Sequence, residues 1–222
     1  MTGRRRARRG GVPLSIPGAG LCLFLAVAAL SDAALPNAAL AQSDRKTDLK
    51  AECARLSRAG GHLVCARAVA ASPNDPHLRR AYGISLSHAG GYDSSVDQFR
   101  RITDLTPKSP VAHFEYGWML AFVRRYAEAV APLERAIALK PDYRRALMIA
   151  AIVYAQLGRP ADQLRVSLAA ARLGDRIAMF DAYDLFHNGK GMPRNEAVAF
   201  LWLRRAAKAG HVGAMDRLGR AS

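Results

Sequence analysis

The sequence predicts an all-α fold, an α-solenoid of stacked antiparallel helix hairpins. Half of the 222 residues are apolar and 7% are aromatic, which favours a helix-rich soluble protein over a disordered chain. Pro73, Pro107 and Pro141 are spaced by 34 residues twice, and a fixed period of this size indicates repeated helical hairpins. A Tyr-Gly pair keeps the same period, because it occupies positions 82–83 and again 116–117.

The first segment, residues 1–41, is predicted to be a cleaved signal peptide. Met1–Arg9 carries five arginines and no acid, Leu21–Leu30 is uninterrupted apolar sequence, and residues 39–41 show the small-residue pattern that a signal peptidase recognises. The apolar run is much shorter than the roughly 20 residues that a bilayer span needs, so no stable membrane anchor is expected. We therefore expect export to the periplasm, with secretion as the alternative.

Residues 42–75 are predicted to form an atypical N-terminal capping hairpin whose turn lies at 58–61. Cys53 and Cys65 lie at equal distances from the middle of this turn, and antiparallel helices place such positions opposite each other. In an oxidising compartment this predicts a disulfide between them, with two buried thiols as the alternative. A metal site that included His62 would lack a fourth ligand of suitable type and spacing, so no metal is expected.

Three repeat units follow, over 76–109, 110–143 and 144–175. Gly83 and Gly117 fall on the first helix of their units, where the missing side chain lets the second helix approach closely. Each of the spaced prolines Pro73, Pro107 and Pro141 ends a second helix, because proline has no N–H to donate and clashes with the preceding turn.

These positions resemble the tetratricopeptide repeat (TPR), a family of helical hairpins. Its pattern of aromatic, Tyr-Gly, Leu, Ala, Phe and Pro is met best over 110–141. The unit 144–175 matches less well, because Ala150 and Ala151 replace the aromatic residue and the glycine, and Gln163 replaces a small residue.

The C-terminal segment, residues 176–222, follows a different period. After Gly174 the spacing changes to 36 residues, with the next equivalent glycine at Gly210. The Gly-Lys-Gly turn at 189–191 and Trp202 keep the spacing of a Sel-one-like repeat, a TPR relative that this segment resembles. We expect one such repeat followed by a C-terminal capping helix.

The TPR resemblance implies a right-handed superhelix whose concave face binds peptides or proteins. Phe114, Trp118 and Phe122 are spaced by four residues, which places them in one line on one helix face. We hypothesise a peptide groove with these three aromatic anchors and with basic rims from Arg80 and Arg145, which takes an apolar partner with acidic flanks. Burial of the stripe as core is the alternative. The predicted groove residues are Arg80, Ile84, Phe114, Trp118, Phe122, Arg145, Met148 and Ile152.

The charge balance suggests a second function. Lys and Arg number 33 against 18 Asp and Glu, and arginine pairs recur along the chain. Such a surface can bind an anionic envelope polymer or lipid, although the pairs do not share one repeat position. No nucleic-acid module occurs, and the motifs of zinc peptidases, serine hydrolases and phosphate-binding loops are absent from the sequence. We therefore expect no enzymatic activity, no cofactor and no small-molecule substrate.

Overall fold

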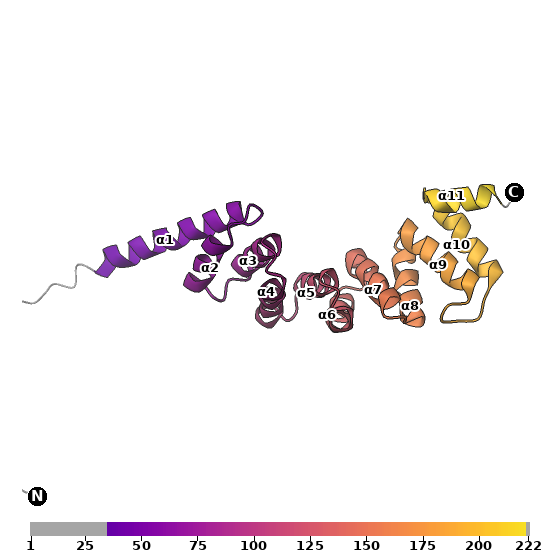
Figure 1. Cartoon of the computed structure of the whole chain (residues 1–222), viewed down its shortest axis with the longest axis horizontal. Coiled ribbons are helices and arrows are strands. Elements are labelled where there is room, and N and C mark those ends of the chain that lie inside the picture. Colours follow the sequence, from indigo (N-terminus) through magenta and orange to yellow (C-terminus); the bar gives the residue numbers. More distant parts are fainter. Residues whose placement is uncertain (1–34, 221–222) are drawn as a thin grey trace, which may run out of the picture.

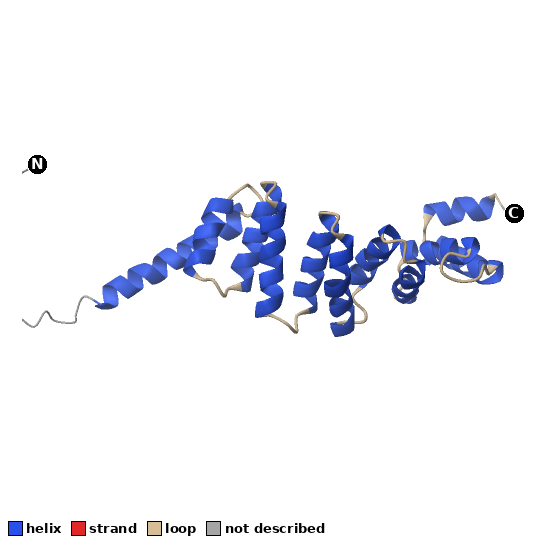
Figure 2. Cartoon of the chain, turned by 60° about the horizontal axis from the view of Figure 1, so that its bottom comes forward, coloured by secondary structure: helices blue, strands red, loops and turns tan. Residues whose placement is uncertain are grey.

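The computed structural model describes residues 35–220, and the elements in that span are all α-helices (Figure 1 and Figure 2). They confirm the prediction of an all-α solenoid. Within the described residues, no helix is long and apolar enough to cross a membrane. The eleven helices between residues 35 and 220 are α1 (Leu35–Leu56), α2 (His62–Ala71), α3 (Pro76–His88), α4 (Tyr92–Leu105), α5 (Pro110–Phe122), α6 (Tyr126–Leu139), α7 (Arg144–Gln156), α8 (Pro160–Arg172), α9 (Arg176–Asn188), α10 (Glu196–Lys208) and α11 (Val212–Gly219).

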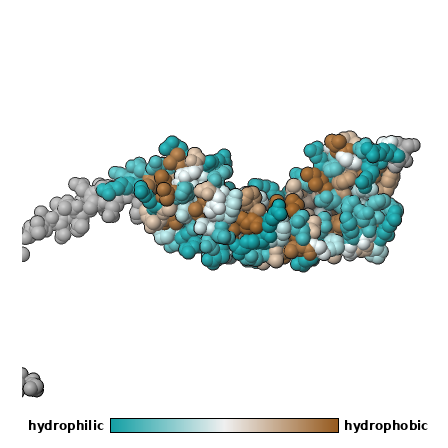
Figure 3. Space-filling view, viewed as in Figure 1, coloured by the Kyte–Doolittle hydropathy of each residue, from teal (hydrophilic) through white to brown (hydrophobic). Residues whose placement is uncertain are grey.

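The helices form a row of five hairpins followed by the single helix α11 within the described part of the chain. Figure 1 shows that α3, α5 and α7 lie along one side of the row, and that α9, α10 and α11 turn up toward that side. Figure 3 shows the same side as hollow between the two raised ends. Residues 1–34, which hold most of the predicted signal peptide, lie outside the described residues, and α1 runs through the predicted cleavage position.

Local capping sets where the helices of the repeats begin. The Asp75 carboxylate accepts hydrogen bonds from the backbone N–H groups of His77 and Leu78, and the Ser109 hydroxyl accepts one from Ala112. In both helices a proline holds the first position, where its missing N–H has no intrahelical partner to lose. The period of the sequence is therefore also a period of helix starts.

Close contact between the two helices of a hairpin depends on small residues. The Ser95 hydroxyl donates to the carbonyl of Gly83 at 2.8 Å, across α3 and α4. A Cβ at Gly117 would lie 2.7 Å from Cγ of Leu133, so α5 and α6 pack through that glycine. One continuous core extends from α4 to α9 through these hairpins.

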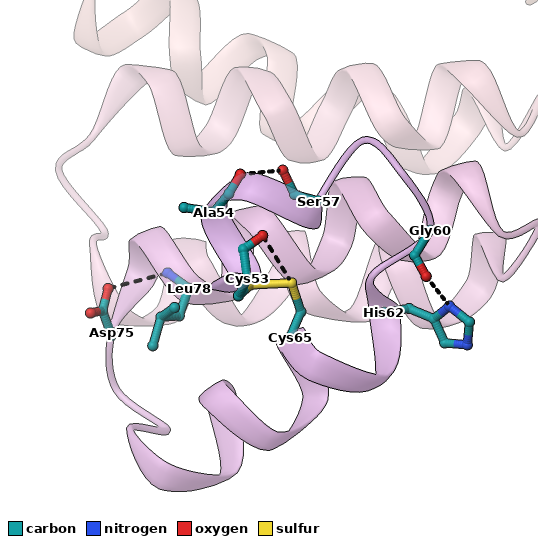
Figure 4. The surroundings of a disulfide bond; sticks show 8 residues. All are labelled: Cys53, Ala54, Ser57, Gly60, His62, Cys65, Asp75 and Leu78. Carbon is teal, nitrogen blue, oxygen red and sulfur yellow. Dashed lines mark hydrogen bonds between the residues drawn. A yellow bond between two sulfur atoms is a disulfide. The ribbon is translucent and has the colours of Figure 1, made fainter. Parts of the chain in front are cut away.

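The N-terminal hairpin is linked covalently in the structure, where a disulfide joins Cys53 of α1 to Cys65 of α2 (Figure 4). Both cysteines are fully buried and share a small core with Leu78 of α3. The Lys50 ammonium group donates to the Asp75 carboxylate at 2.6 Å, which joins α1 to the start of α3. The hairpin is thus held both within itself and against the first repeat.

The turn between α9 and α10 requires glycine at two positions. Gly189 and Gly191 have φ of 64° and 78°, a region that side chains disfavour. A Cβ at Gly191 would also lie 2.6 Å from the backbone nitrogen of Ala161, at the start of α8. The turn can therefore pack directly against the preceding hairpin.

Candidate functional site

An aromatic patch formed by Tyr92, Trp118 and Phe122 is exposed on neighbouring hairpins. Trp118 and Phe122 lie one turn apart on α5, with stacked rings whose centroids are 5.7 Å apart. Phe122 also meets the ring of Tyr92, at the start of α4, edge-on at 5.7 Å. Trp118 is 40% exposed, Phe122 55% and Tyr92 44%, so about half of each ring faces outward and the three rings form one partly exposed surface.

Phe114, the third member of the predicted aromatic line, does not belong to this patch. It is only 3% exposed, because the ring of Tyr143 packs against it at 5.0 Å and the guanidinium of Arg145 lies 4.9 Å above it. Tyr143 precedes α7, so the next hairpin buries this end of the stripe. Phe114 is a core residue here and offers no anchor to a partner, which corrects the expectation of three accessible rings.

The two predicted rim arginines both make contacts within the chain. Arg80 donates to the Glu115 carboxylate at 2.6 Å and so joins α3 to α5, yet its side chain remains half exposed. Arg145 is held over Phe114 by a cation–π contact. Neither residue is a freely moving charge.

A basic hollow lies between α1 and α3, next to Arg80. Its volume is about 470 Å³, and it is lined by Arg55 at the end of α1, Arg58 in the turn that follows, His77 and the half-buried Ile84. Three guanidinium groups around one open hollow create a positive potential, which favours an acidic ligand. The predicted residues Arg80 and Ile84 are therefore brought together here.

Met148 and Ile152 are brought together elsewhere, at a cavity between α7, α8 and α9. The cavity measures about 50 Å³ and also contacts Asp181 of α9. Burial raises the pKa of the Asp181 carboxyl to about 6, and the nearby carboxylates of Asp184 and Asp175 raise it further in the same direction. A carboxyl group in this state attracts a cation strongly, because a cation offsets both the lost hydration and the repulsion.

Tyr92, Arg55, Arg58 and Asp181 were not predicted as site residues from the sequence. Tyr92 carries a usable signal, since it and Tyr126 occupy the same repeat position, but the contact with Phe122 crosses from one hairpin to the next. Asp181 can be identified as a candidate only in the folded chain, because its cavity is formed by side chains from three helices. Within residues 35–220, no group of three or more His, Cys, Asp or Glu side chains is arranged to hold a metal ion.

Comparison with solved structures shows the same fold. MamA from Desulfovibrio magneticus RS-1 superposes with a TM-score of 0.61 at 18% identity, over 76% of this chain and 94% of that one. PilF of Pseudomonas aeruginosa gives 0.58 at 16% identity, over 77% and 78% of the two chains. YrrB, described as a TPR protein with an unusual peptide-binding site, gives 0.57 at 15% identity, over 71% and 81%. The chain therefore has a TPR-like helical fold.

The sequence similarity to a curated protein covers only a short part of the chain. Superkiller complex protein 3 of Mus musculus is 30% identical over 80 residues, which are 36% of this chain and 5% of that protein. No family model matches the chain.

Proposed function

We propose that this protein is a non-enzymatic scaffold that binds a peptide or protein segment on its hollow side. The aromatic patch carries the proposal, because exposed clusters of large apolar rings typically mark interaction surfaces. Trp and Tyr are also enriched among the residues that dominate binding energy at interfaces. Trp118 and Phe122 are the main anchors, and Tyr92 extends the surface to the preceding hairpin.

The basic hollow gives the partner a charge preference. Arg55 and Arg58 form no hydrogen bond or salt bridge with the described residues through their side chains, and Arg80 keeps half of its side chain exposed. A segment that places apolar side chains on the aromatic patch and acidic side chains on the hollow would satisfy both surfaces.

The fold supports this class of function by analogy. YrrB has a similar fold and is described as having a peptide-binding site. In this chain Arg145 lies over the ring of Phe114, and Met148 and Ile152 belong to α7. We propose that these residues shape the surface and that Trp118 and Phe122 supply most of the affinity.

We propose that the protein acts in the periplasm after removal of residues 1–41, and that secretion is the alternative destination. The bond between Cys53 and Cys65 fits an oxidising compartment, where disulfides form and persist. The resemblance of residues 176–222 to a Sel-one-like repeat remains part of this proposal.

Electrostatic binding of an anionic envelope polymer or lipid is the competing function. The contacts within the chain weigh against it. Five arginine pairs lie in the described residues that follow the first hairpin, at 79–80, 100–101, 124–125, 144–145 and 204–205, and each has at least one member held by a neighbour. These members are Arg79 and Arg80, Arg100, Arg125, Arg144 and Arg145, and Arg205.

The experiment that separates the two functions is affinity capture from envelope extract at low and moderate salt. The bait is residues 42–222, compared with the variant Trp118→Ala, Phe122→Ala. Retention of the same proteins at moderate salt by the parent, and their loss from the variant, is expected. Equal capture by both baits, removed from both by salt, would establish the electrostatic function instead, because exposed charges are screened by salt.

A further inference from the structure

The cavity between α7, α8 and α9 differs in its chemistry from the aromatic patch and from the basic hollow. Its mouth is apolar, with Ile152 of α7 53% exposed and Ile177 of α9 50% exposed, while Met148 lies half buried beside them. Its lining also includes two polar side chains, Asp181 of α9 and the fully buried Ser167 of α8. An apolar lining with a few polar groups is the pattern of ligand-binding pockets, and at this size it suits a single small group.

The Asp181 carboxyl has no partner of its own. No hydrogen-bond donor or cation contacts it among the described residues, although the whole chain holds 33 basic residues against 18 acidic ones. Its two acidic neighbours are paired, since Asp175 meets Arg144 at 3.2 Å and Asp184 meets Lys190 at 3.4 Å. Asp181 is thus a carboxylate in an acidic neighbourhood that the chain's own cations leave unneutralised.

Ser167 provides an independent observation at the same cavity. Its hydroxyl is completely buried and forms no hydrogen bond in the structure. Buried polar groups are nearly always hydrogen-bonded, and leaving one unpaired is costly. A ligand with hydrogen-bond donors would satisfy this hydroxyl and the Asp181 carboxylate together.

The size of the cavity narrows the class of ligand. About 50 Å³ accommodates one or two groups the size of a water molecule. An ammonium group is compact and has three donors, whereas a guanidinium is a wider planar fork. The exposed isoleucines at the mouth suit the aliphatic stem of a lysine, which packs along apolar surface while its charged end reaches a polar partner.

We propose that this cavity binds an ammonium group of the partner, supplied by a lysine side chain, with Asp181 as its counter-ion and Ser167 as a second hydrogen-bond partner. Ile152 and Ile177 contact the stem, and Met148 closes one wall. This proposal rests on the proposed scaffold function, because that function is the reason for taking the ligand to be a protein side chain. It gives the hollow side an acidic subsite at α9, opposite in charge to the basic hollow at α1 and α3.

The test is an NMR titration of residues 42–222 with n-pentylammonium chloride, which reproduces a lysine stem and its charge. The control ligand is n-pentanol, which has the same stem without the charge. Saturable shifts of the Ile152 and Ile177 methyl signals with the amine alone are expected, and Asp181→Asn should weaken the binding at least tenfold. Equal shifts with both ligands, no shifts, or an unchanged affinity in the variant would overturn the proposal.

Two additional measurements keep the result unambiguous. Asp181→Asn is close to isosteric, and the dispersion of its methyl spectrum checks that it folds. Ser167→Ala should also weaken the binding of the amine. Titration with Ac-Ala-Lys-Ala-NH2 and with H-Ala-Ala-Ala-NH2 separates a lysine side chain from an N-terminal amine, and stronger binding of the second would overturn the lysine assignment. The probes are small cations, so this outcome is independent of whether the aromatic patch binds a partner.

Discussion

The ring of Phe122 at the end of α5 meets the ring of Tyr92 at the start of α4 with centroids 5.7 Å apart and planes inclined by 62°. Because Trp118 stacks on the same Phe122 ring, one aromatic surface spans two consecutive hairpins. The spacing between hairpins therefore sets the shape of this surface. A partner bound there would contact both hairpins at once.

The aromatic stripe of α5 should separate into a structural residue and binding residues. Phe114→Ala is expected to destabilise the protein by about 3–5 kcal/mol, because it empties a site in a packed core. Trp118→Ala and Phe122→Ala are expected to cost roughly 1 kcal/mol or less each, because their rings are substantially exposed. Urea unfolding of the three variants measures this, and similar losses in all three would contradict the burial described here.

Gly117 should tolerate no side chain. Gly117→Ala places a Cβ 2.7 Å from Leu133 Cγ and 3.2 Å from its backbone nitrogen, so α5 and α6 must move apart. We expect a loss of about 1–3 kcal/mol, the usual cost of overpacking. Gly213→Ala in α11 is the matched control, since its nearest contact would be 3.4 Å and the change should be neutral or slightly stabilising. An equal loss of stability at both positions would show that the close approach of α5 and α6 is not the reason for glycine at position 117.

The disulfide should stabilise the N-terminal hairpin. Residues 42–222 contain only Cys53 and Cys65, so denaturation without reductant should reveal no free thiol. The bond closes a loop of 12 residues, and its reduction should lower the free energy of unfolding by about 2–3 kcal/mol. The double variant Cys53→Ala, Cys65→Ala serves as the control, because its stability should not respond to reductant. Two titratable thiols in the untreated protein would contradict the bond.

Asp181 should lower stability at neutral pH. Burial raises the pKa of this carboxyl to about 6, above its ordinary value of 3.8, with further contributions from Asp184 and Asp175. The folded state then binds a proton more tightly than the unfolded state, so the contribution of Asp181 to stability falls as pH rises from about 4 to 6. Asp181→Asn should remove this dependence and should stabilise the free protein above pH 6 by roughly 1 kcal/mol. This value is smaller than the full pKa shift corresponds to, because solvent screens a partly exposed carboxyl.

Urea unfolding of the parent and of Asp181→Asn at pH 4, 5, 6 and 7.5 measures that difference. A gap that widens with pH is expected. A gap that stays constant with pH would show that ionisation of Asp181 does not cost stability. A variant less stable than the parent at pH 7.5 would show that Asp181 stabilises the native fold. Either result would contradict an unneutralised carboxylate at this cavity.

The fold was predictable from the sequence because its determinants are local and periodic. Asp75 and Ser109 cap helices within their own segments, and the prolines that follow them fix the same starts. Gly117 marks a close approach that each repeat needs for itself. Features that repeat within one hairpin can be identified without knowing how hairpins pack on one another.

The site was predictable only in part, because it forms between hairpins. The spacing of Trp118 and Phe122 places them together on α5, as the sequence indicates. The burial of Phe114 depends on Tyr143 of the following hairpin, and the cavity at Asp181 needs side chains from three helices. Those contacts are tertiary, so no pattern along one helix contains them.

The most direct test of the scaffold function is peptide selection from a phage-displayed dodecapeptide library at moderate salt. Three baits are compared: residues 42–222, the patch variant Trp118→Ala, Phe122→Ala, and the control variant Phe200→Ala, Leu201→Ala. The control removes two similarly exposed apolar side chains from α10, away from the patch. The parent and the control should enrich one apolar motif with acidic flanks, and the patch variant should not enrich it. Enrichment of the same motif by all three baits, or of no motif by the parent, would contradict the proposed scaffold function.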